Sequence, residues 1–384
     1  MKITVNKRWF IAILLIGMVL ILVSEPFKIT SGMSLGTYTI FLATVGSLCM
    51  GVAEYYKNGA KVDFFVFVFF LLLSVLPFLF AGEFTFGKLV PLVCFLEVPI
   101  LMESYSCSSK RMKQVIFWIA YAVSWYYLAV SFSPVAHNYE GDYGIARISE
   151  LTLGLPNPNQ TGMYLTFIFM VLLIAFFSVS KLRFLFLINA GITFALIFLT
   201  KSRAAILLCV LLSFIAFFGF RYKIANLLRK WIWIVPVLMF VFLMTAEDFY
   251  SQLVIMEDAF DTGRVEVYTG ALESLNMDNI WFGNYLEYFQ QNLHNIFVSV
   301  LVEYGVIVTA FYFFYMYIKT KGVFLDRDLK GQNVGFLSFA FIIVYSSVEA
   351  TLFINGSVYA MFVFLLFYLS IPEEESECGL EAQE

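Results

Sequence analysis

Long apolar runs constrain this chain more than any other feature of its sequence. Runs of roughly 20 residues with few or no charges recur along its whole length, and about 20 apolar residues cross the hydrocarbon core of a bilayer as one helix. Of the 384 residues, 61% are hydrophobic and only 14% are charged. Because backbone polar groups must be paired inside lipid, the sequence predicts an all-α, polytopic integral membrane protein with one transmembrane domain over residues 1–384.

The apolar windows predict about twelve membrane spans. They lie at about residues 9–24, 34–55, 62–81, 84–102, 114–135, 160–180, 182–200, 203–220, 231–246, 294–318, 334–353 and 356–371. The fourth span is interrupted by Lys88, Pro91, Glu97 and Pro99, so a continuous and a broken helix both stay open. An even number of spans places both termini on one side of the membrane.

The distribution of lysine and arginine predicts which side that is, because cytoplasmic loops carry an excess of these residues. With the N-terminus inside, 18 of the 24 lysines and arginines lie in inside segments. The other six lie outside or toward the outer ends of spans: Lys28, Lys88, Arg147, Lys201, Arg203 and Arg264. Both termini are therefore predicted to be cytoplasmic.

Two long segments fall on the outer side in this topology. They are a first outer loop at 136–159 and a second, lid-like outer loop at 247–293. The acidic segment 372–384 is predicted to be a disordered cytoplasmic tail. The net charge of −4 says little by itself, and nucleic-acid binding has no support in the sequence. Function is expected on the outer face, where the long loops lie.

A few polar residues on that face depart from their surroundings. Lys201 and Arg203 lie at the outer turn between the seventh and eighth spans, Arg264 is the one cation of the acidic second loop, and His294 opens the tenth span. Each has an ordinary interpretation as a helix cap, an ion-pair partner or a polar anchor. Together they suit a substrate with a phosphate or diphosphate, which arginine binds through paired donors.

Three motifs, in this order, resemble the O-antigen ligase and polymerase family of bacterial envelopes. They are Leu199-Thr-Lys-Ser-Arg-Ala-Ala205, Thr262-Gly-Arg264 and His294-Asn-Ile-Phe-Val-Ser-Val-Leu-Val-Glu-Tyr-Gly305. The segment Leu155-Pro-Asn-Pro-Asn-Gln-Thr-Gly162 is similar to the Asn-rich start of a helix in that family. The resemblance covers mainly residues 155–310. The chain departs from the family pattern at Trp281-Phe-Gly-Asn-Tyr285, where a second glycine is frequent.

The resemblance implies a metal-independent glycosyltransferase of GT-C-like architecture that needs no cofactor and uses a glycan carried on undecaprenyl diphosphate. Arg203 and Arg264 would hold the donor diphosphate, and His294 would orient or deprotonate the acceptor hydroxyl. The candidate substrate-binding residues are Lys201, Asn157, Asn159 and Asn295. The implied partners are lipid-linked donor and acceptor glycans and membrane lipids at the outer face of the bacterial cytoplasmic membrane. Other capsule-assembly proteins stay open as partners.

Within the family, a polymerase is favoured over a ligase because the outer loops are compact and rich in Phe and Tyr, similar to those of capsule polymerases. A ligase that moves glycan to a different acceptor stays open. A different class, a lipid-linked oligosaccharide flippase or transporter, also fits twelve spans but needs ionisable groups near the membrane midplane. Few are predicted there, namely Glu97, Glu303 and Glu349, with Glu303 about 13 Å deeper than His294 along a continuous helix. A non-catalytic scaffold would leave the outer polar residues unexplained.

Overall fold

The computed structural model describes residues 15–16, 19, 22–23, 108–137, 151–153, 155, 158–219, 270–277, 279–283, 296–320, 334–348, 357–371 and 373. These residues form helices and no strand, apart from an isolated parallel bridge between Ser108 and Glu373. The helices are α5 (Lys110–Ser131), η1 (Pro134–His137), α6 (Pro158–Ser178), α7 (Arg183–Leu199), α8 (Arg203–Phe214), the π-helical η2 (Ile215–Gly219), α15 (Ile296–Thr320), α16 (Val334–Val348) and α17 (Ser357–Ser370). The all-helical fold class is confirmed for the described part of the chain.

The long helices lie where the apolar windows predict spans, with bounds that differ by a few residues. The predicted spans at 34–55, 62–81, 84–102 and 231–246 lie outside the described residues. Among the described helices, α5 and α6 are long and apolar enough to cross a membrane, and several shorter helices are similarly apolar. Length and composition therefore support a membrane protein, as the sequence predicts.

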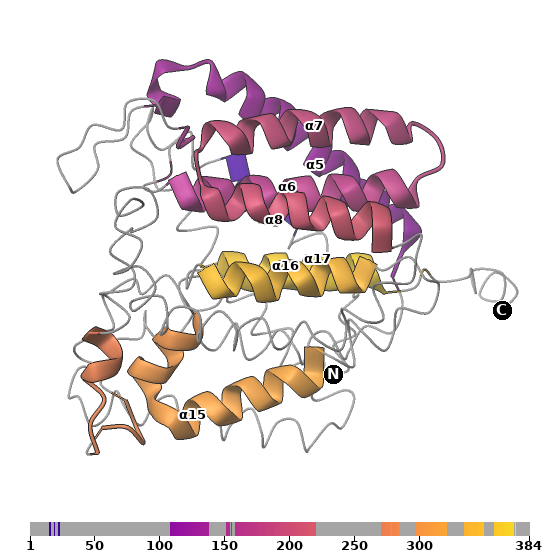
Figure 1. Cartoon of the computed structure of the whole chain (residues 1–384). Helices are drawn as coiled ribbons and strands as arrows, with labels where there is room; N and C mark the ends of the chain where they lie inside the picture. The colour runs from indigo at the N-terminus through magenta and orange to yellow at the C-terminus, as the bar shows by residue number, and fades with distance from the viewer. Residues whose placement is uncertain are drawn as a thin grey trace, which may run out of the picture.

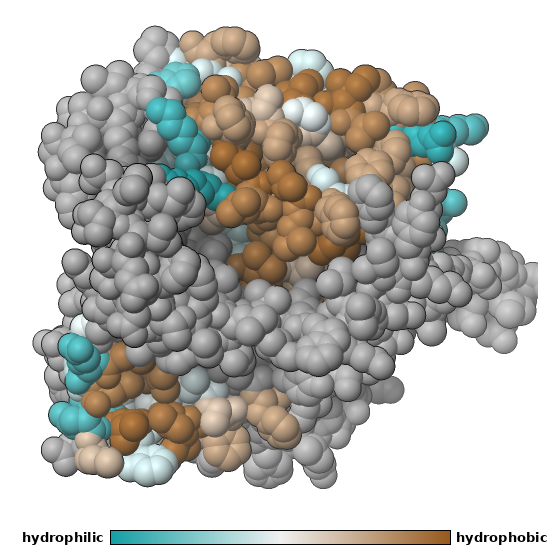
Figure 2. Space-filling model, in the orientation of Figure 1, coloured by the Kyte–Doolittle hydropathy of each residue, from teal (hydrophilic) through white to brown (hydrophobic). Residues whose placement is uncertain are grey.

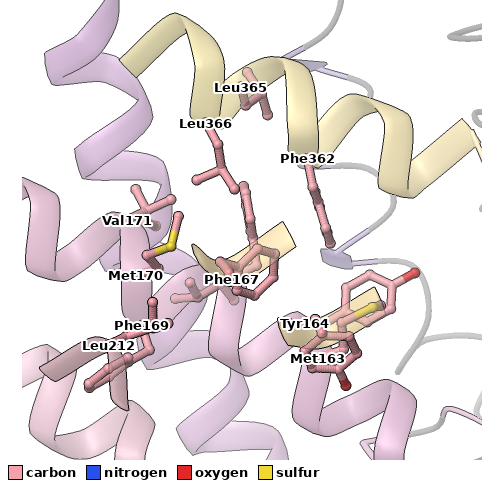
Figure 3. Packing of buried hydrophobic residues seen from close by; sticks show 14 of the residues in the cluster. Met163, Tyr164, Phe167, Phe169, Met170, Val171, Leu212, Phe362, Leu365 and Leu366 are labelled. Atoms are coloured by element: carbon pink, nitrogen blue, oxygen red, sulfur yellow. The ribbon is translucent and has the colours of Figure 1, made fainter. Parts of the chain in front are cut away.

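The centre of the described structure is α6. It packs against α5, α7, α8 and α16 (Figure 1), and all of its residues from Thr161 to Ala175 are buried. A helix that is apolar on all sides can be covered by protein or by lipid, and in the described structure other helices cover α6. Its covering includes α17, whose Phe362 ring stacks on Phe167 with 3.9 Å between the ring centroids (Figure 3).

α7 and α8 have the opposite character, because they expose large apolar side chains. The exposed residues include Phe184, Leu185, Ile188, Phe198, Leu199, Leu207, Val210, Leu211 and Phe214. Exposed cations flank them, Lys181 and Arg183 at one end and Lys201 and Arg203 at the other. Figure 2 shows this hydrophobic band over α7 and α8 with hydrophilic residues at both ends. The 17 residues of α7 span about 25 Å, close to the roughly 30 Å thickness of a bilayer core.

The predicted inner ends of α5 and α17 are joined by polar contacts. The Lys113 side chain is buried, and its Nζ donates to the carbonyl oxygens of Leu369 (2.9 Å) and Ile371 (2.5 Å). The Ser108 hydroxyl donates to the same Ile371 carbonyl (3.2 Å). A lysine at this position satisfies carbonyls that a helix leaves unpaired at its C-terminus, and its charge is favourable there. These contacts hold Ile371, the last residue before the predicted acidic tail, against the start of α5.

α15 is not a continuous helix. Gly305 has φ 76° and ψ 177°, which breaks the helix between Tyr304 and Val306. The two parts run in different directions, and the bend lies at the same end of the bundle as the turn between α7 and α8 (Figure 1). The single uninterrupted span predicted at 294–318 is therefore wrong in this respect, and the physical cause is a contact described below.

Candidate functional site

The turn between α7 and α8 presents two cations on a fixed backbone. Thr200 and Ser202 are buried, whereas Lys201 and Arg203 alternate with them and are exposed. Arg203 is the first residue of α8, and the Ser202 side chain caps that helix by accepting from the N–H of Ala205 (3.5 Å). The sequence favours this geometry locally, because serine is a preferred residue before the first turn of a helix.

Hydrogen bonds of Thr200 hold the turn from its buried side. Its hydroxyl donates to the carbonyl of Ile197 (2.7 Å) and accepts from the N–H of Ser202 (3.2 Å). Lys201 has a left-handed backbone with φ 55°, a conformation that costs a non-glycine residue about 1–2 kcal/mol. Leu153 and Leu182 also have left-handed φ, so the exposed positive charges of Lys201 and Arg203, and not the strain, make the turn a candidate site.

The start of α6 packs directly onto this turn. A Cβ placed on Gly162 would lie 2.9 Å from the Cβ atoms of both Ser202 and Ala205, so a side chain has no room there. Two motifs that are about 40 residues apart, the Asn-rich segment 155–162 and the cationic turn 199–205, are therefore in contact in the fold.

Asn159 lies in the first turn of α6 and is partly buried. Its carbonyl accepts a hydrogen bond from the Tyr345 hydroxyl of α16 (2.8 Å). The end of the first outer loop is attached to the same region, since the Thr161 hydroxyl donates to the Thr152 carbonyl (2.5 Å) and the N–H of Leu151 donates to the carbonyl of Leu199 (3.1 Å). The first outer loop, α6, α7, α8 and α16 thus meet at one end of the bundle.

The predicted site residues fall into two groups. Lys201, Arg203 and Asn159 lie in described residues, and the contact between α6 and α8 brings their helix ends together. The other predicted residues lie outside the described residues: Asn157, Arg264, His294 and Asn295. The convergence of Arg203, Arg264 and His294 on one substrate therefore stays a prediction.

A second set of contacts, which sequence reasoning missed, lies at the bend of α15. A Cβ on Gly305 would lie 2.4 Å from the carbonyl oxygen of Trp281, and a Cβ on Gly283 would lie 2.3 Å from the carbonyl oxygen of Glu303. Both glycines have left-handed φ, 76° and 80°. Backbone therefore packs on backbone between the segment 279–283 and the bend. The sequence signal was present as a glycine inside each motif.

The segment 279–283 also supplies a hydrogen-bond acceptor for the helix after the bend. The N–H of Val306, the first residue after Gly305, donates to the carbonyl of Ile280 (2.9 Å). Before the bend, Val298 and Val302 pack with Ala271, Leu272 and Leu275 in a small apolar cluster. These contacts attach the described part of the second outer loop to α15 on both sides of the bend.

Glu303 is a buried carboxylate beside this contact. Its Oε2 atom has no hydrogen-bond partner, and the residue stands two positions before Gly305. The sequence predicted that Glu303 lies deep in a continuous span. Because the bend lies at the end of the bundle that also holds the α7–α8 turn, the depth expected for a straight helix does not apply (Figure 1).

No family model matches this sequence, and neither a curated protein nor a solved structure matches it. Within the described residues, His, Cys, Asp and Glu do not form a group of three that could hold a metal ion. What the chain does is therefore argued from its residues and their geometry.

Proposed function

We propose that the chain is a polysaccharide polymerase of about twelve spans and GT-C-like architecture. It transfers glycan from undecaprenyl diphosphate onto another lipid-linked repeat unit at the outer face of the cytoplasmic membrane. The observation that carries the proposal is the fixed turn between α7 and α8, which exposes Lys201 and Arg203 and packs against the Asn-rich start of α6 through Gly162.

The exposed surface supports a membrane location for this turn. The hydrophobic band over α7 and α8 ends in cations at both sides, as expected of helices whose middles contact acyl chains and whose ends reach the headgroups. In this placement the Lys201–Arg203 turn lies at the level of lipid phosphates. A diphosphate that is attached to a polyprenyl chain is held at the same level.

The chemistry of the turn fits a diphosphate. The guanidinium of Arg203 can donate two parallel hydrogen bonds to phosphate oxygens, and the ammonium of Lys201 adds a second positive charge two residues away. Arg203 also stands at the first turn of α8, where backbone N–H groups favour an anion. These groups would stabilise the charge that grows on the leaving diphosphate.

In the proposed reaction, the hydroxyl oxygen of the acceptor sugar attacks the anomeric carbon of the donor glycan. The bond between that carbon and the diphosphate oxygen breaks, and undecaprenyl diphosphate leaves with the bonding electron pair. The acceptor hydroxyl proton passes to the imidazole of His294, and Arg264 assists Arg203 on the diphosphate.

A transport path would need charged groups through the middle of the bundle. In the described residues the buried Lys, Arg, Asp and Glu side chains are Lys113, which caps α17 at the predicted inner end, and Glu303, which adjoins the bend. Glu97 and Glu349, which the sequence also predicts deep in spans, lie outside the described residues. A ligase would use the same donor and differ only in its acceptor, so the products decide between ligase and polymerase.

The test uses purified protein and the lipid-linked repeat unit of its own strain. The wild type is expected to give a ladder of longer products, and Arg203→Ala is expected to lower the rate roughly 100-fold, as does the loss of one charge-stabilising donor elsewhere. Arg203→Lys should recover little activity, because it lacks the paired donors. Arg183→Ala is the matched control, since Arg183 is also an exposed first residue of a helix but lies at the opposite end of α7.

Wild-type activity in Arg203→Ala would remove this residue from the site. A single larger product that carries a foreign acceptor would indicate the ligase, and protein that moves substrate between leaflets without extending it would indicate the flippase.

A further inference from the structure

The turn formed by residues 276–277 and 279–283 has an unusually well-fixed backbone for an exposed segment. Asn276 and Asn279 bond to each other reciprocally, each backbone N–H donating to the other side-chain oxygen (2.7 and 3.2 Å). The N–H groups of Ile280 and Gly283 donate to the carbonyls of Asn276 and Asn279. The N–H groups of Asn276, Asn279, Ile280, Phe282 and Gly283 are paired within the turn, which lowers the cost of moving this part of the backbone into a less polar environment.

The same turn is joined rigidly to α15. The contact between Gly283 and the backbone of Glu303, the contact between Gly305 and Trp281, and the hydrogen bond from Val306 to Ile280 fix its position relative to the bend. Any depth that the turn takes in a membrane is therefore set by α15.

This fixed turn exposes three large apolar side chains. Met277 is 86% exposed, Trp281 53% and Phe282 47%. Their exposure continues onto α15 beyond the bend, where Val306, Phe311 and Phe314 are also exposed. The lower part of Figure 2 shows this apolar surface with hydrophilic residues at its left end. A contiguous exposed apolar surface of this kind marks an interaction site.

The position of the turn indicates what covers it. The bend lies at the end of the bundle that carries the exposed cations Lys201 and Arg203 (Figure 1), and the helix beyond it runs away from that end. A tryptophan at the start of an exposed apolar helix surface suits the boundary between headgroups and acyl chains, because its ring is apolar and its N–H can donate to the polar side.

We propose that the turn at 276–277 and 279–283 is an interfacial anchor, in which Met277, Trp281 and Phe282 insert between the headgroups and acyl chains of the outer leaflet. The anchor holds the described part of the second outer loop at the height of the lipid diphosphate. The inference rests on the membrane placement in the proposed function and is independent of glycosyl transfer.

Tryptophan fluorescence in vesicles tests the anchor on the full chain. The chain has six tryptophans, so the contribution of Trp281 is the difference in emission between the wild type and Trp281→Phe. Vesicles are prepared with phosphatidylcholine that carries bromines either near the headgroup end or near the middle of the acyl chains. The Trp281 contribution should lose most of its emission with the shallow bromines, less with the deep bromines, and little with iodide in the water.

Trp125→Phe provides the matched control, because Trp125 is exposed on α5 and lies at the centre of the predicted span 114–135. Its contribution should be quenched more by the deep bromines. If Trp125 behaves in this way while Trp281 is quenched by iodide and not by bromolipid, the anchor is overturned and the membrane placement stands. If Trp281 is shielded from both quenchers, a protein surface covers the turn and the anchor is also overturned. If neither tryptophan is quenched by bromolipid, both the anchor and the membrane placement fall.

Discussion

The turn between α7 and α8 and the bend of α15 have the same left-handed backbone conformation, but with different consequences for the side chain. Lys201 at the turn and Gly305 at the bend both have left-handed φ, 55° and 76°. At the turn the Cβ points to an exposed side, so a long cationic side chain is present despite the strain. At the bend the Cβ position is taken by the backbone of Trp281 and Phe282. The left-handed residue at the turn therefore carries an exposed side chain, whereas the one at the bend allows two backbone segments to pack closely.

The largest effect is expected from Gly305→Ala, which combines left-handed strain with a clash against backbone atoms. We expect a loss of about 3 kcal/mol or more in the free energy of unfolding, and a similar loss for Gly283→Ala. Thermal unfolding in detergent micelles measures it. Gly191→Ala is the control, because a Cβ there meets nothing within 4 Å and alanine favours a helix interior. Equal melting temperatures for Gly305→Ala and the wild type would refute the close contact.

A smaller effect is expected from Gly162→Ala, because its neighbours are side-chain atoms of Ser202 and Ala205 at 2.9 Å and α6 can shift away from α8. We expect a loss of about 1–3 kcal/mol. Since the shift moves the cationic turn, the rate of product formation should fall even at temperatures where the variant is fully folded. The rate and length of the products are compared with those of Gly191→Ala at a temperature where both variants are folded. Unchanged products would show that the contact between α6 and the turn does not affect the site.

The smallest effect on stability, with the opposite sign, is expected from Lys201→Gly. Glycine adopts left-handed φ without strain, so the variant should gain about 1 kcal/mol or less. Product formation should nevertheless fall, since a positive charge is lost. Lys201→Ala keeps the strain and loses the charge, which separates the two contributions. A Lys201→Gly variant with lower stability and full activity would show that the turn is neither strained nor used.

Much of the fold could be predicted because membrane spans depend on local composition. The predicted windows 182–200 and 203–220 became α7 at Arg183–Leu199 and α8 with η2 at 203–219, with Lys201 between them as expected. The break in the tenth span could not be predicted with the same rule, since residues 296–318 carry a single charge, Glu303, and are otherwise mostly apolar. The break depends on the distant segment 279–283, and hydropathy does not register a contact between backbones.

In the candidate site, too, the local features could be predicted from the sequence and the contacts between distant segments could not. The sequence predicted that Lys201 and Arg203 lie together at one turn, because two residues in one helix start cannot be far apart. It did not predict that Gly162 holds the Asn-rich start of α6 against Ser202, or that Trp281-Phe-Gly283 interlocks with Glu303-Tyr-Gly305. Local sequence specifies helices, caps and the charge of a turn through short-range sterics and transfer free energies. Which turns touch depends on whether side chains leave room for close approach, and only the folded chain decides that.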